Sequence, residues 1–514
     1  MKLGKSQQVL DAIELGKFQP TGTARILALG GNSNALGGDI SSLFDNPAGL
    51  SQYRTNEALI STGLFLNNVS MRYNESDFNN NRSRLNMGAS GLVFSLYNDK
   101  NGKIKRTNIG IGLCQSANFN TEFHYKGTNK NSSFSEKWVE ELIGNNIRSF
   151  SEALGFSPAG ASLAVENYLI DTATNANGQK GYITNANLDK TSLNLNQSFI
   201  YRTTGSANEI SLGLSSHHTE KFYYGFAIGI PFLQRTESAT ITEKDMSGNT
   251  DNDFDQFTYT EEITTKGTGI LFRGGVLYKP FEYFRIGFNF QSPTFYTLTR
   301  SADANLENNI ENYARRINND NTKPQEFKTS TMEINNGNLY SYDFNLMTPW
   351  RMSLAIAYVF RETDNVKKQR AALTAAVDFV NYQAVEFNTS NTENNQSSSQ
   401  FYSKLNHDIK EIYRPALNFS IGGELKFHTI MFRGGFRYQQ SPYEENALPL
   451  VQGYQLTPSM GIGYRDKGIF VDLAYSHNFG DGIHFPYILS GNIYPYANSH
   501  NRNGQILLTI GTKF

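Results

Sequence analysis

The sequence has little of what disulfide-bonded domains or helical membrane proteins require. Its one cysteine, Cys114, cannot form an intrachain disulfide and stands outside any catalytic cysteine pattern, which favours a buried structural thiol. No run approaches the roughly 18 apolar residues of a membrane-spanning helix. The longest apolar stretch, 222–233, is too short and contains Gly225, Gly229 and Pro231. Helical membrane spans are therefore excluded.

Excess charge and catalytic motifs are missing as well. Lys and Arg number 46 against 47 Asp and Glu, and no basic run occurs, so we expect no nucleic-acid partner. There is no G-x-S-x-G, H-E-x-x-H, paired C-x-x-C or P-loop motif, and the pairs Gly30-Gly31 and Gly37-Gly38 lack the context of a dinucleotide fingerprint. His217 and His218 would point to opposite faces of a strand. We expect no enzyme, no metal site and no cofactor.

What the sequence does have is a period of two. From about residue 56 to the end, large apolar side chains alternate with small or polar ones, and each such stretch ends in a turn. Phe222, Tyr224, Phe226 and Ile228 share one face of such a stretch. The mean hydropathy of −0.46 agrees with this pattern, because a barrel carries its apolar band on every second residue of a strand.

Residues 417–438 distinguish a membrane barrel from a soluble sandwich. A tight turn near His428 would place Glu424 opposite Arg433, an oppositely charged cross-strand pair on the polar face. Sandwich strands are near five or six residues long. These stretches are longer and end in aromatic residues, like tilted membrane strands of about 9 to 11 residues. We therefore predict an all-β fold, a transmembrane antiparallel β-barrel whose lumen is polar.

Short turns alternate with long polar loops along residues 56–514, the predicted barrel domain. The short turns are expected at 99–103, 217–221, 279–282, 363–367, 427–429 and 465–468, and the long loops at 128–190, 244–253, 301–340, 391–409, 442–452 and 480–503. With short turns in the periplasm and long loops outside, the pattern predicts about fourteen strands.

The loop 128–190 is too long to lack structure, and two short helices are expected in it. The first has Trp138, Val139, Leu142, Ile143 and Ile147 on one stripe; the second begins with Ser157 as cap and Pro158, and leads to Tyr168 and Leu169. Two interpretations stay open. The helices pack on each other and close the barrel mouth, or they form a landing site for a hydrophobic ligand at Trp138, Leu142, Ile143, Tyr168 and Leu169.

The segment before the first strand is rich in Gly and Ala and almost uncharged. Residues 21–55 cannot build a domain, but small residues suit close packing against an enclosing wall, so we predict a plug inside the barrel. Residues 1–20 are expected to be a periplasmic segment. They contain no apolar stretch of a secretion signal, so a signal is expected to have been removed or replaced.

This segment resembles the hatch of the FadL/TodX family of outer-membrane transporters of hydrophobic compounds. The matching residues are Gly22, Ala24, Arg25, Gly30, Gly31, Ala35, Gly37, Gly38, Asp39, Ser41 and, above all, 46–50, Asn-Pro-Ala-Gly-Leu. The segments 168–171, 292–294 and 348–350 are similar to segments in a branch of that family sometimes labelled hemin receptors. The terminal Phe514 resembles the signal that barrel-assembly machinery recognises.

The resemblance implies a barrel of about fourteen strands with an N-terminal hatch, a low-affinity site in the loops, an apolar pocket in the lumen and lateral release at a kinked strand. It assigns hatch and gating roles to Arg25, Gly37, Gly38, Asp39, Asn46, Pro47 and Ala48. We expect Asn46 to tie the hatch to the wall by hydrogen bonds and Pro47 to fix a turn. Pro293 and Pro349 mark either a bend or break in the wall or two strand ends.

Two functions follow as hypotheses. The first is passive uptake of a small hydrophobic or amphipathic compound, such as a fatty acid, an aromatic hydrocarbon or heme, across the outer membrane of a Gram-negative bacterium. The second is a structural or assembly role in a larger envelope protein complex. A TonB-type receptor would need a larger plug than about fifty residues. Lipopolysaccharide, other outer-membrane lipids and the assembly machinery are the further partners expected of such a barrel.

Overall fold

The computed structural model describes residues 12–16, 19–74, 76–97, 106–174, 180–187, 193–249, 252–360, 370–390, 396–444, 453–490 and 495–514. Most of these residues lie in strands of one sheet. No helix among them is long and apolar enough to cross a membrane.

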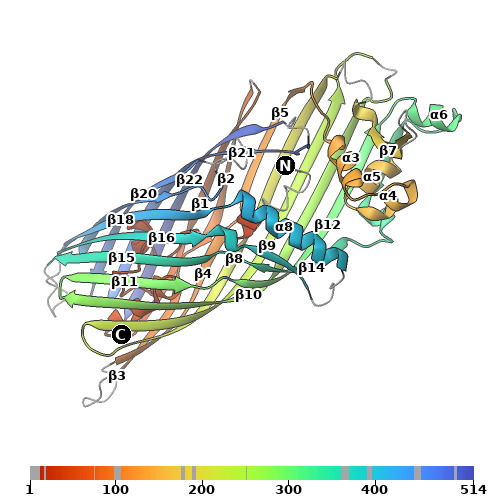
Figure 1. The fold of residues 1–514 in the computed structure, drawn as a ribbon. Coiled ribbons are helices and arrows are strands. Elements are labelled where there is room, and N and C mark those ends of the chain that lie inside the picture. The colour runs from red at the N-terminus through yellow and green to blue at the C-terminus, as the bar shows by residue number, and fades with distance from the viewer. Residues whose placement is uncertain are drawn as a thin grey trace.

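The sheet closes into an antiparallel barrel of fourteen strands, as predicted (Figure 1). Closure is made by β1 and β22, whose ladder runs from Glu57 opposite Lys513 to Arg72 opposite Asn498. Nine barrel strands are continuous: β1 (Glu57–Tyr73), β8 (Leu195–His217), β9 (Phe222–Asp245), β10 (Gln256–Phe281), β18 (Pro415–Phe427), β19 (Ile430–Gln439), β20 (Gln455–Asp466), β21 (Ile469–His484) and β22 (Ala497–Lys513).

Five barrel strands are each interrupted once. They are β2 (Ser76–Met87) with β3 (Ser90–Tyr97), β4 (Arg106–Asn118) with β5 (Thr121–Asn129), β11 (Phe284–Gln291) with β12 (Phe295–Asn309), β14 (Tyr340–Met347) with β15 (Trp350–Phe360), and β16 (Ala371–Asn381) with β17 (Glu386–Thr389). A further short strand, β13 (Glu326–Ser330), pairs with the outer end of β12.

Side chains alternate between the two faces of the wall as the period of two predicts. On β9, Phe222, Phe226 and Phe232 are exposed on the outside, whereas Ala227 and Leu233 face the interior and are buried. Beyond Phe232 the outward positions of β9 become polar. The apolar belt therefore covers only the periplasmic part of this 24-residue strand, and its outer part rises above the membrane.

The polar inner face contains the predicted cross-strand pair. Glu424 stands opposite Arg433 in the β18–β19 ladder, and its Oε2 lies 2.6 Å from Nε of Arg433. The turn between these strands contains His428, with φ of 54°. The predicted strand register and the predicted inward orientation of this pair are thus both confirmed at this hairpin.

The long loop between β5 and β8 holds three helices within the described residues, not the predicted two. They are α3 (Ser135–Gly144), α4 (Phe150–Phe156) and α5 (Ala161–Glu166), followed by the hairpin of β6 (Ile170–Thr174) and β7 (Lys180–Thr184) and by η3 (Asn185–Asn187). Ser157 ends α4 instead of capping the next helix. These elements gather at the barrel end opposite the C-terminus (Figure 1).

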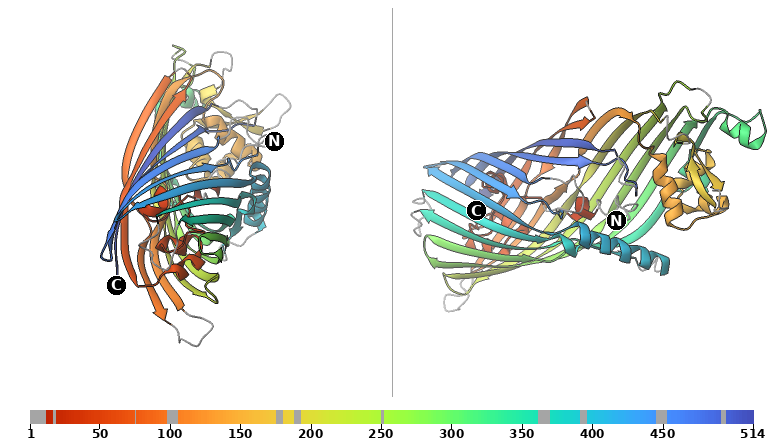
Figure 2. Two further views of the ribbon diagram at one scale, coloured as in Figure 1. Left: turned by 90° about the vertical axis from the view of Figure 1, so that its left-hand side faces the viewer. Right: turned by 45° about the horizontal axis from the view of Figure 1, so that its top comes forward.

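In the part of the chain that the structure describes, four more helical elements lie in the outer loops and within one strand. These are α6 (Tyr313–Asn318), α7 (Thr331–Ile334), η5 (Tyr382–Ala384) and the longer α8 (Gln396–Ile412). Leu405 and Ile409 of α8 are buried in an apolar cluster that also contains Ile13 and Leu15. Figure 2 shows α8 beside the described N-terminal residues.

The position of residues 12–16 differs from the prediction that 1–20 form a periplasmic segment. Ile13 and Leu15 pack with α8 and Tyr413, which belong to the long-loop side of the barrel. Burial of these apolar side chains against α8 explains the difference. The remaining residues of the predicted segment, apart from Gln19 and Pro20, lie outside the described residues.

The two prolines lie where adjacent strands are interrupted. Pro293 separates β11 from β12, and Pro349 separates β14 from β15. Thr294 and Thr348 bridge the break, because the Thr348 amide donates to the Thr294 carbonyl at 3.1 Å and the Thr294 amide donates to Thr348 Oγ1 at 2.9 Å. The prolines therefore mark a break in the ladder that hydrogen bonds hold closed.

Candidate functional site

The hatch consists of α2 (Ala24–Ala28) and two 3₁₀ helices, η1 (Ile40–Phe44) and η2 (Pro47–Gln52), inside the barrel. Asp39 holds its turns together, since Oδ1 accepts hydrogen bonds from the Ser41 amide at 3.0 Å and from Ser41 Oγ at 2.7 Å, and Oδ2 accepts from Thr23 Oγ1 at 2.9 Å. Gly37 and Gly38, with φ of 60° and 66°, turn the chain between these contacts. Asp39 thus serves as a cap inside the hatch.

Asn46 ties the hatch to the wall, as predicted. Its side chain is fully buried, and Nδ2 donates to the carbonyl of Val276 in β10 at 3.1 Å and to Asn34 Oδ1 at 2.7 Å. Its Oδ1 accepts from the backbone amide of Ala48 at 3.1 Å. The Asn46 side chain therefore also caps η2, in which Pro47 is the first residue. Ala48 is buried against Tyr223 and Leu277 of the wall.

Glycines on the inner face of the wall make room for this contact. A Cβ atom on Gly275 would overlap Asn46 Oδ1, and one on Gly225 would overlap the backbone of Pro47 and Ala48. A Cβ on Gly422 would likewise overlap the carbonyl of Leu29. Hatch backbone and barrel backbone are therefore in close contact at several strands.

Buried ion pairs anchor the hatch on the other side of the lumen. Arg25 lies 3.2 Å from Glu424, which also pairs with Arg433, and Arg433 lies 2.6 Å from Asp472. A second network joins Asp45 of the hatch to Arg351 at 3.0 Å. The side chains of Arg433 and Asp472 are 0% and 1% exposed, and removing one partner of such a pair costs about 3 to 5 kcal/mol.

A further ion pair lies beside the Asp45–Arg351 pair and also holds the hatch. Arg437 lies 3.0 Å from Asp378, and its guanidinium donates to the carbonyls of Gly30 and Gly31 at 2.9 and 2.8 Å. Hydrogen bonds, ion pairs and backbone contact therefore all hold the hatch in one position.

A cavity of about 410 Å³ lies in the lumen above the hatch. It contacts Gln19, Pro20 and Leu27 on the hatch side, apolar side chains such as Met71 and Phe123, and many amides and hydroxyls of the surrounding strands. The predicted pocket in the lumen is thus present. Its lining is mixed, however, and not wholly apolar as the family resemblance implied.

Next to this cavity the barrel wall has an unpaired seam, which we define as the boundary between β2 (Ser76–Met87) and residues 114–129 of β4 and β5. β3 pairs with β4 only up to Leu113, and the described residues of β2 form a ladder with β1 but none with β5. β5 stays paired with β8 on its other side. The backbone N–H and C=O groups along both edges of the seam therefore lack ladder partners across it.

Side chains span the seam instead of backbone hydrogen bonds. Arg82 forms an ion pair with Glu122, and His124 Nδ1 lies 2.6 Å from Asn80 Oδ1. At the inner surface Asn67 Nδ2 donates to the Asn120 carbonyl at 2.7 Å. Solvent-accessible side-chain pairs contribute little, typically below about 1 kcal/mol each, so the seam is held more weakly than a boundary with a continuous backbone ladder.

The hatch closes the periplasmic end of the seam. Thr21 Oγ1 lies 2.7 Å from Cys114 Sγ and donates to the Gln115 carbonyl at 3.1 Å, while the Gly22 carbonyl accepts from the Ala89 amide at 2.9 Å. Both edges of the seam are thus joined to the start of the hatch. Cys114 is buried there as a structural thiol.

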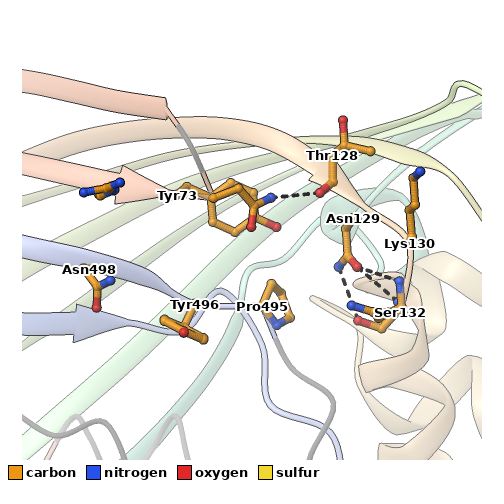
Figure 3. A pocket seen from close by; sticks show the side chains of 11 residues that line it. Tyr73, Thr128, Asn129, Lys130, Ser132, Pro495, Tyr496 and Asn498 are labelled. Atoms are coloured by element: carbon orange, nitrogen blue, oxygen red, sulfur yellow. Dashed lines mark hydrogen bonds between the residues drawn. The ribbon is translucent and has the colours of Figure 1, made fainter.

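A second, smaller pocket of about 250 Å³ lies at the outer end of the seam. Figure 3 shows its lining from three segments: Tyr73 at the end of β1, residues 128–132 at and just beyond the end of β5, and Pro495, Tyr496 and Asn498 around the start of β22. Asn129 in this pocket donates to Ser132 Oγ at 3.4 Å and to Gln197 Oε1 at 3.0 Å. The lining is polar, so this pocket does not suit an apolar ligand.

The predicted landing residues in the long loop divide into two groups. Trp138, Leu142 and Leu169 are buried in the apolar core beneath α3 and α5. Ile143 is 40% exposed, and Tyr168 is half-buried against Phe327, with ring centroids 5.3 Å apart. The structure therefore brings three of the five residues together as core, which agrees with the interpretation that the helices pack together and close the mouth.

The residues of the seam and of the cavity beside it could not be predicted from the sequence pattern. Arg82, Glu122, Asn67 and Asn118 lie in strands whose period of two gives their face but not their neighbours. The dense polar run 74–84 in an otherwise apolar array was the available signal. No group of metal-binding side chains occurs among the residues that the structure describes.

Comparison with known proteins identifies the class of this barrel. A family model described as outer membrane protein transport protein (OMPP1/FadL/TodX) matches residues 3–486. A crystal structure of a Pseudomonas aeruginosa FadL homologue is 13% identical with a TM-score of 0.55, and the match covers 97% of this chain and 100% of that one. A search of curated proteins finds no match.

Two further solved structures are more distant in shape. The Pseudomonas putida toluene transporter TodX is 14% identical, with a TM-score of 0.49 over 97% of this chain and 99% of that one. The Ralstonia pickettii toluene transporter TbuX is 14% identical, with a TM-score of 0.48 over 96% and 99% of the two chains.

Proposed function

The chain belongs to the OMPP1/FadL/TodX family of outer membrane transport proteins, and on that premise we propose that it takes up a small hydrophobic or amphipathic compound through the luminal cavity and releases it sideways at the seam. A family of transport proteins of this kind serves passage across the outer membrane and not catalysis. The fold of a FadL-type barrel agrees with this role.

One observation carries the proposal: the cavity and the seam meet at the break between β4 and β5. Residues 118–121 line the cavity, and the same residues belong to the unpaired edge of the wall. The hatch, fixed by buried hydrogen bonds and ion pairs, occupies the axial route below. A cargo in the cavity therefore has a weakly closed boundary beside it and a firmly closed one beneath it.

The height of the seam favours an exit toward lipid. Leu64 and Leu85, which pair with each other just below Arg82, are both exposed on the outside of the barrel. The periplasmic end of the seam therefore lies at the level of the apolar belt. Transfer of a cargo from the cavity into the bilayer gains about 25 cal/mol for each Å² of apolar surface that leaves water.

The alternative, a structural or assembly partner in an envelope complex, requires no passage through the barrel. A lumen filled by side chains would have favoured it. The cavity of about 410 Å³ supports transport instead.

Closing the seam covalently tests the proposal. In a Cys114→Ser background, the pair Arg82→Cys and Glu122→Cys is bridged with a short thiol-cleavable reagent, and uptake of labelled toluene, octanoate and 1-octanol is measured in cells that lack their own transporters of this class. We expect the bridge to reduce uptake at least fivefold and its reduction to restore uptake. The matched control is Asn196→Cys with Lys244→Cys, which face outward on the fully paired strands β8 and β9.

Three outcomes separate the claims. Loss of uptake only with the seam bridge supports lateral release. Unchanged uptake with a complete bridge would reject the seam as the exit while leaving transport intact. No uptake above that of cells without the protein, for any labelled compound, would reject transport.

A further inference from the structure

Two buried polar atoms beside the cavity have no hydrogen-bond partner. They are Asn67 Oδ1 on β1 and Asn118 Nδ2 at the end of β4, and both residues line the cavity. Asn67 is 7% exposed. Buried polar groups of proteins are nearly always hydrogen-bonded, so an unpartnered acceptor and an unpartnered donor on residues that line one cavity are groups to which a ligand there could bond.

The orientation of both amides is fixed by their other bonds. Asn67 Nδ2 donates to the Asn120 carbonyl at 2.7 Å, a bond that the flipped amide would lose. Asn118 Oδ1 accepts from the Asn120 amide and from Asn120 Nδ2, each at 2.9 Å. The free atom of Asn67 is therefore the oxygen and that of Asn118 the nitrogen. Because both side chains bond to Asn120, the two residues lie close together at the edge of the cavity.

The charges of the cavity lining restrict the class of ligand further. The ionisable lining groups are the carboxylates of Glu14, Glu237 and Asp481, the guanidinium of Arg235 and the imidazole of His484. Arg235 forms an ion pair with Glu237. Arg502 lies 3.4 Å from Asp481, so these two cations are already paired with carboxylates and neither of them is left for an anionic cargo.

Apolar side chains complete the lining. Leu27, Val69, Met71, Phe119 and Phe123 all contact the cavity. A ligand that fits therefore has an apolar body and one uncharged polar group.

We propose that the cavity selects a neutral amphiphile whose hydroxyl group donates a hydrogen bond to Asn67 Oδ1 and accepts one from Asn118 Nδ2. This inference rests on the proposed transport function and names the class of its cargo. A hydroxyl satisfies both atoms at once, because it is donor and acceptor. A carboxylate only accepts, an ammonium only donates, and a hydrocarbon does neither, so each leaves at least one buried atom unpaired.

The test compares ligands that differ in the polar group. Binding of 1-octanol, octanoate, octylammonium and toluene is measured at neutral pH by isothermal titration calorimetry, with the full-length protein in lipid nanodiscs and protein-free nanodiscs as the blank. We expect 1-octanol to bind at least tenfold more tightly than any of the other three. Two hydrogen bonds of ordinary net strength correspond to about this factor.

Two variants assign the preference to the two amides. Asn118→Asp keeps the oxygen that accepts from Asn120 and removes the free donor, and Asn67→Leu removes the free acceptor. Each is expected to weaken 1-octanol binding about tenfold and toluene binding much less, because toluene forms no hydrogen bond with either amide. Asn68→Leu, on the outward face of the same strand, is the matched control and should change neither.

The outcomes distinguish this inference from the function on which it rests. If a charged probe or toluene binds as tightly as 1-octanol, or if neither variant lowers the affinity for 1-octanol, the inference fails and transport of hydrophobic compounds stands. If none of the four probes binds, both fail.

Discussion

At the scale of single residues, glycine decides whether the hatch can dock. Gly274 and Gly275 are neighbours on β10, and they differ only in the face they occupy. Nothing lies within 4 Å of a Cβ on Gly274, whereas a Cβ on Gly275 would overlap the side chain of Asn46. The same small side chain is thus neutral at one position and incompatible with the hatch at the next.

Gly275→Ala is therefore expected to displace Asn46 and loosen the hatch without unfolding the barrel. The side-chain amide of Asn46 would lose its hydrogen bond to the Val276 carbonyl, and polar solutes would then pass around the hatch. Conductance of single proteins in planar bilayers should rise severalfold over the wild-type value. Gly274→Ala is the control, and an equal rise there, or none in Gly275→Ala, would contradict the steric argument.

A second residue, Glu243, ties the long loop to the outer part of β9, above the apolar belt. Its carboxylate accepts from Ser133 Oγ at 2.5 Å, from the Phe134 amide at 2.7 Å and from Gln197 Nε2 at 2.6 Å. Burial raises the pKa of Glu243 to about 7, although these hydrogen bonds favour the charged form. The group therefore titrates in the neutral range.

Because the folded-state pKa of Glu243 lies above the ordinary value of 4.5, the folded loop binds a proton that the unfolded loop releases. The local stability is then highest below about pH 4.5, falls as pH rises and levels off above about pH 7, a loss of roughly 3 kcal/mol. Hydrogen exchange of residues 134–142, corrected for its intrinsic pH dependence, should be faster at pH 8 than at pH 5. In Glu243→Gln this difference should vanish; its persistence would assign the effect to another group.

Residue identities were predictable where a motif fixes them and not where three dimensions do. Asn46 and Pro47 belong to a contiguous segment. The predicted tie by Asn46 was confirmed, and Pro47, which was expected to fix a turn, is the first residue of the 3₁₀ helix η2. Gly275 and Asn67 carry no local signal. A period of two tells that both face the lumen, but which hatch atom or empty space lies opposite depends on the stagger of strands around the barrel.

At the scale of elements, breaks in strands differ in consequence. The break at Pro293 and Pro349 was visible in the sequence, because proline cannot donate to a ladder, but Thr294 and Thr348 hydrogen-bond across it. The break at Phe119 and Asn120 contains no proline, and on both sides of it residues 114–129 have no ladder with the described residues of β2. The sequence thus shows where a backbone N–H donor is absent, but it does not show where a strand edge lacks a neighbouring strand to pair with.

The seam should be visible in backbone hydrogen exchange. Each strand amide points to one neighbour or the other, so about half of the amides in β2 and β5 face the seam and half face β1 or β8. We expect the seam-facing half to exchange orders of magnitude faster than the other half, by NMR in detergent micelles. The outer part of β9, paired with β8 and β10, is the internal control, and protection of every amide in β2 would refute an unpaired seam.

The helices of the long loop show a different limit of sequence reasoning. The stripe of Trp138 and Leu142 correctly indicated a helix, and both residues are core. The next helix, α4, was missed although Ser149 and Glu152 form a capping box around its start. Its single buried residue, Ala153, gives no apolar stripe, so periodicity alone could not find it.

At the scale of the whole molecule, the barrel and the hatch are separable parts. The wall is closed by the β1–β22 ladder. Every backbone pair of that ladder joins one wall strand to the other, and none includes a hatch residue. Inward charges of the wall also keep partners on the wall: Glu424 retains Arg433, Arg433 retains Asp472, and Arg437 retains Asp378. Removing the hatch would therefore leave paired charges in water and not isolated ones in a dry core.

Deletion of residues 1–52 is accordingly expected to yield a folded barrel with an open pore. Small barrels fill their interior with side chains, but here Gly225, Gly275 and Gly422 leave that space to the hatch. The shortened chain should still shift in mobility on heating, as closed barrels do in gels, and should conduct ions far better than Gly275→Ala. A folded but non-conducting barrel would mean that the loop layer and α8, and not the hatch, close the lumen. A chain that fails to fold would show instead that Asn46, Arg25 and Asp45 are needed to assemble the wall, and would contradict the separability argued from its charges.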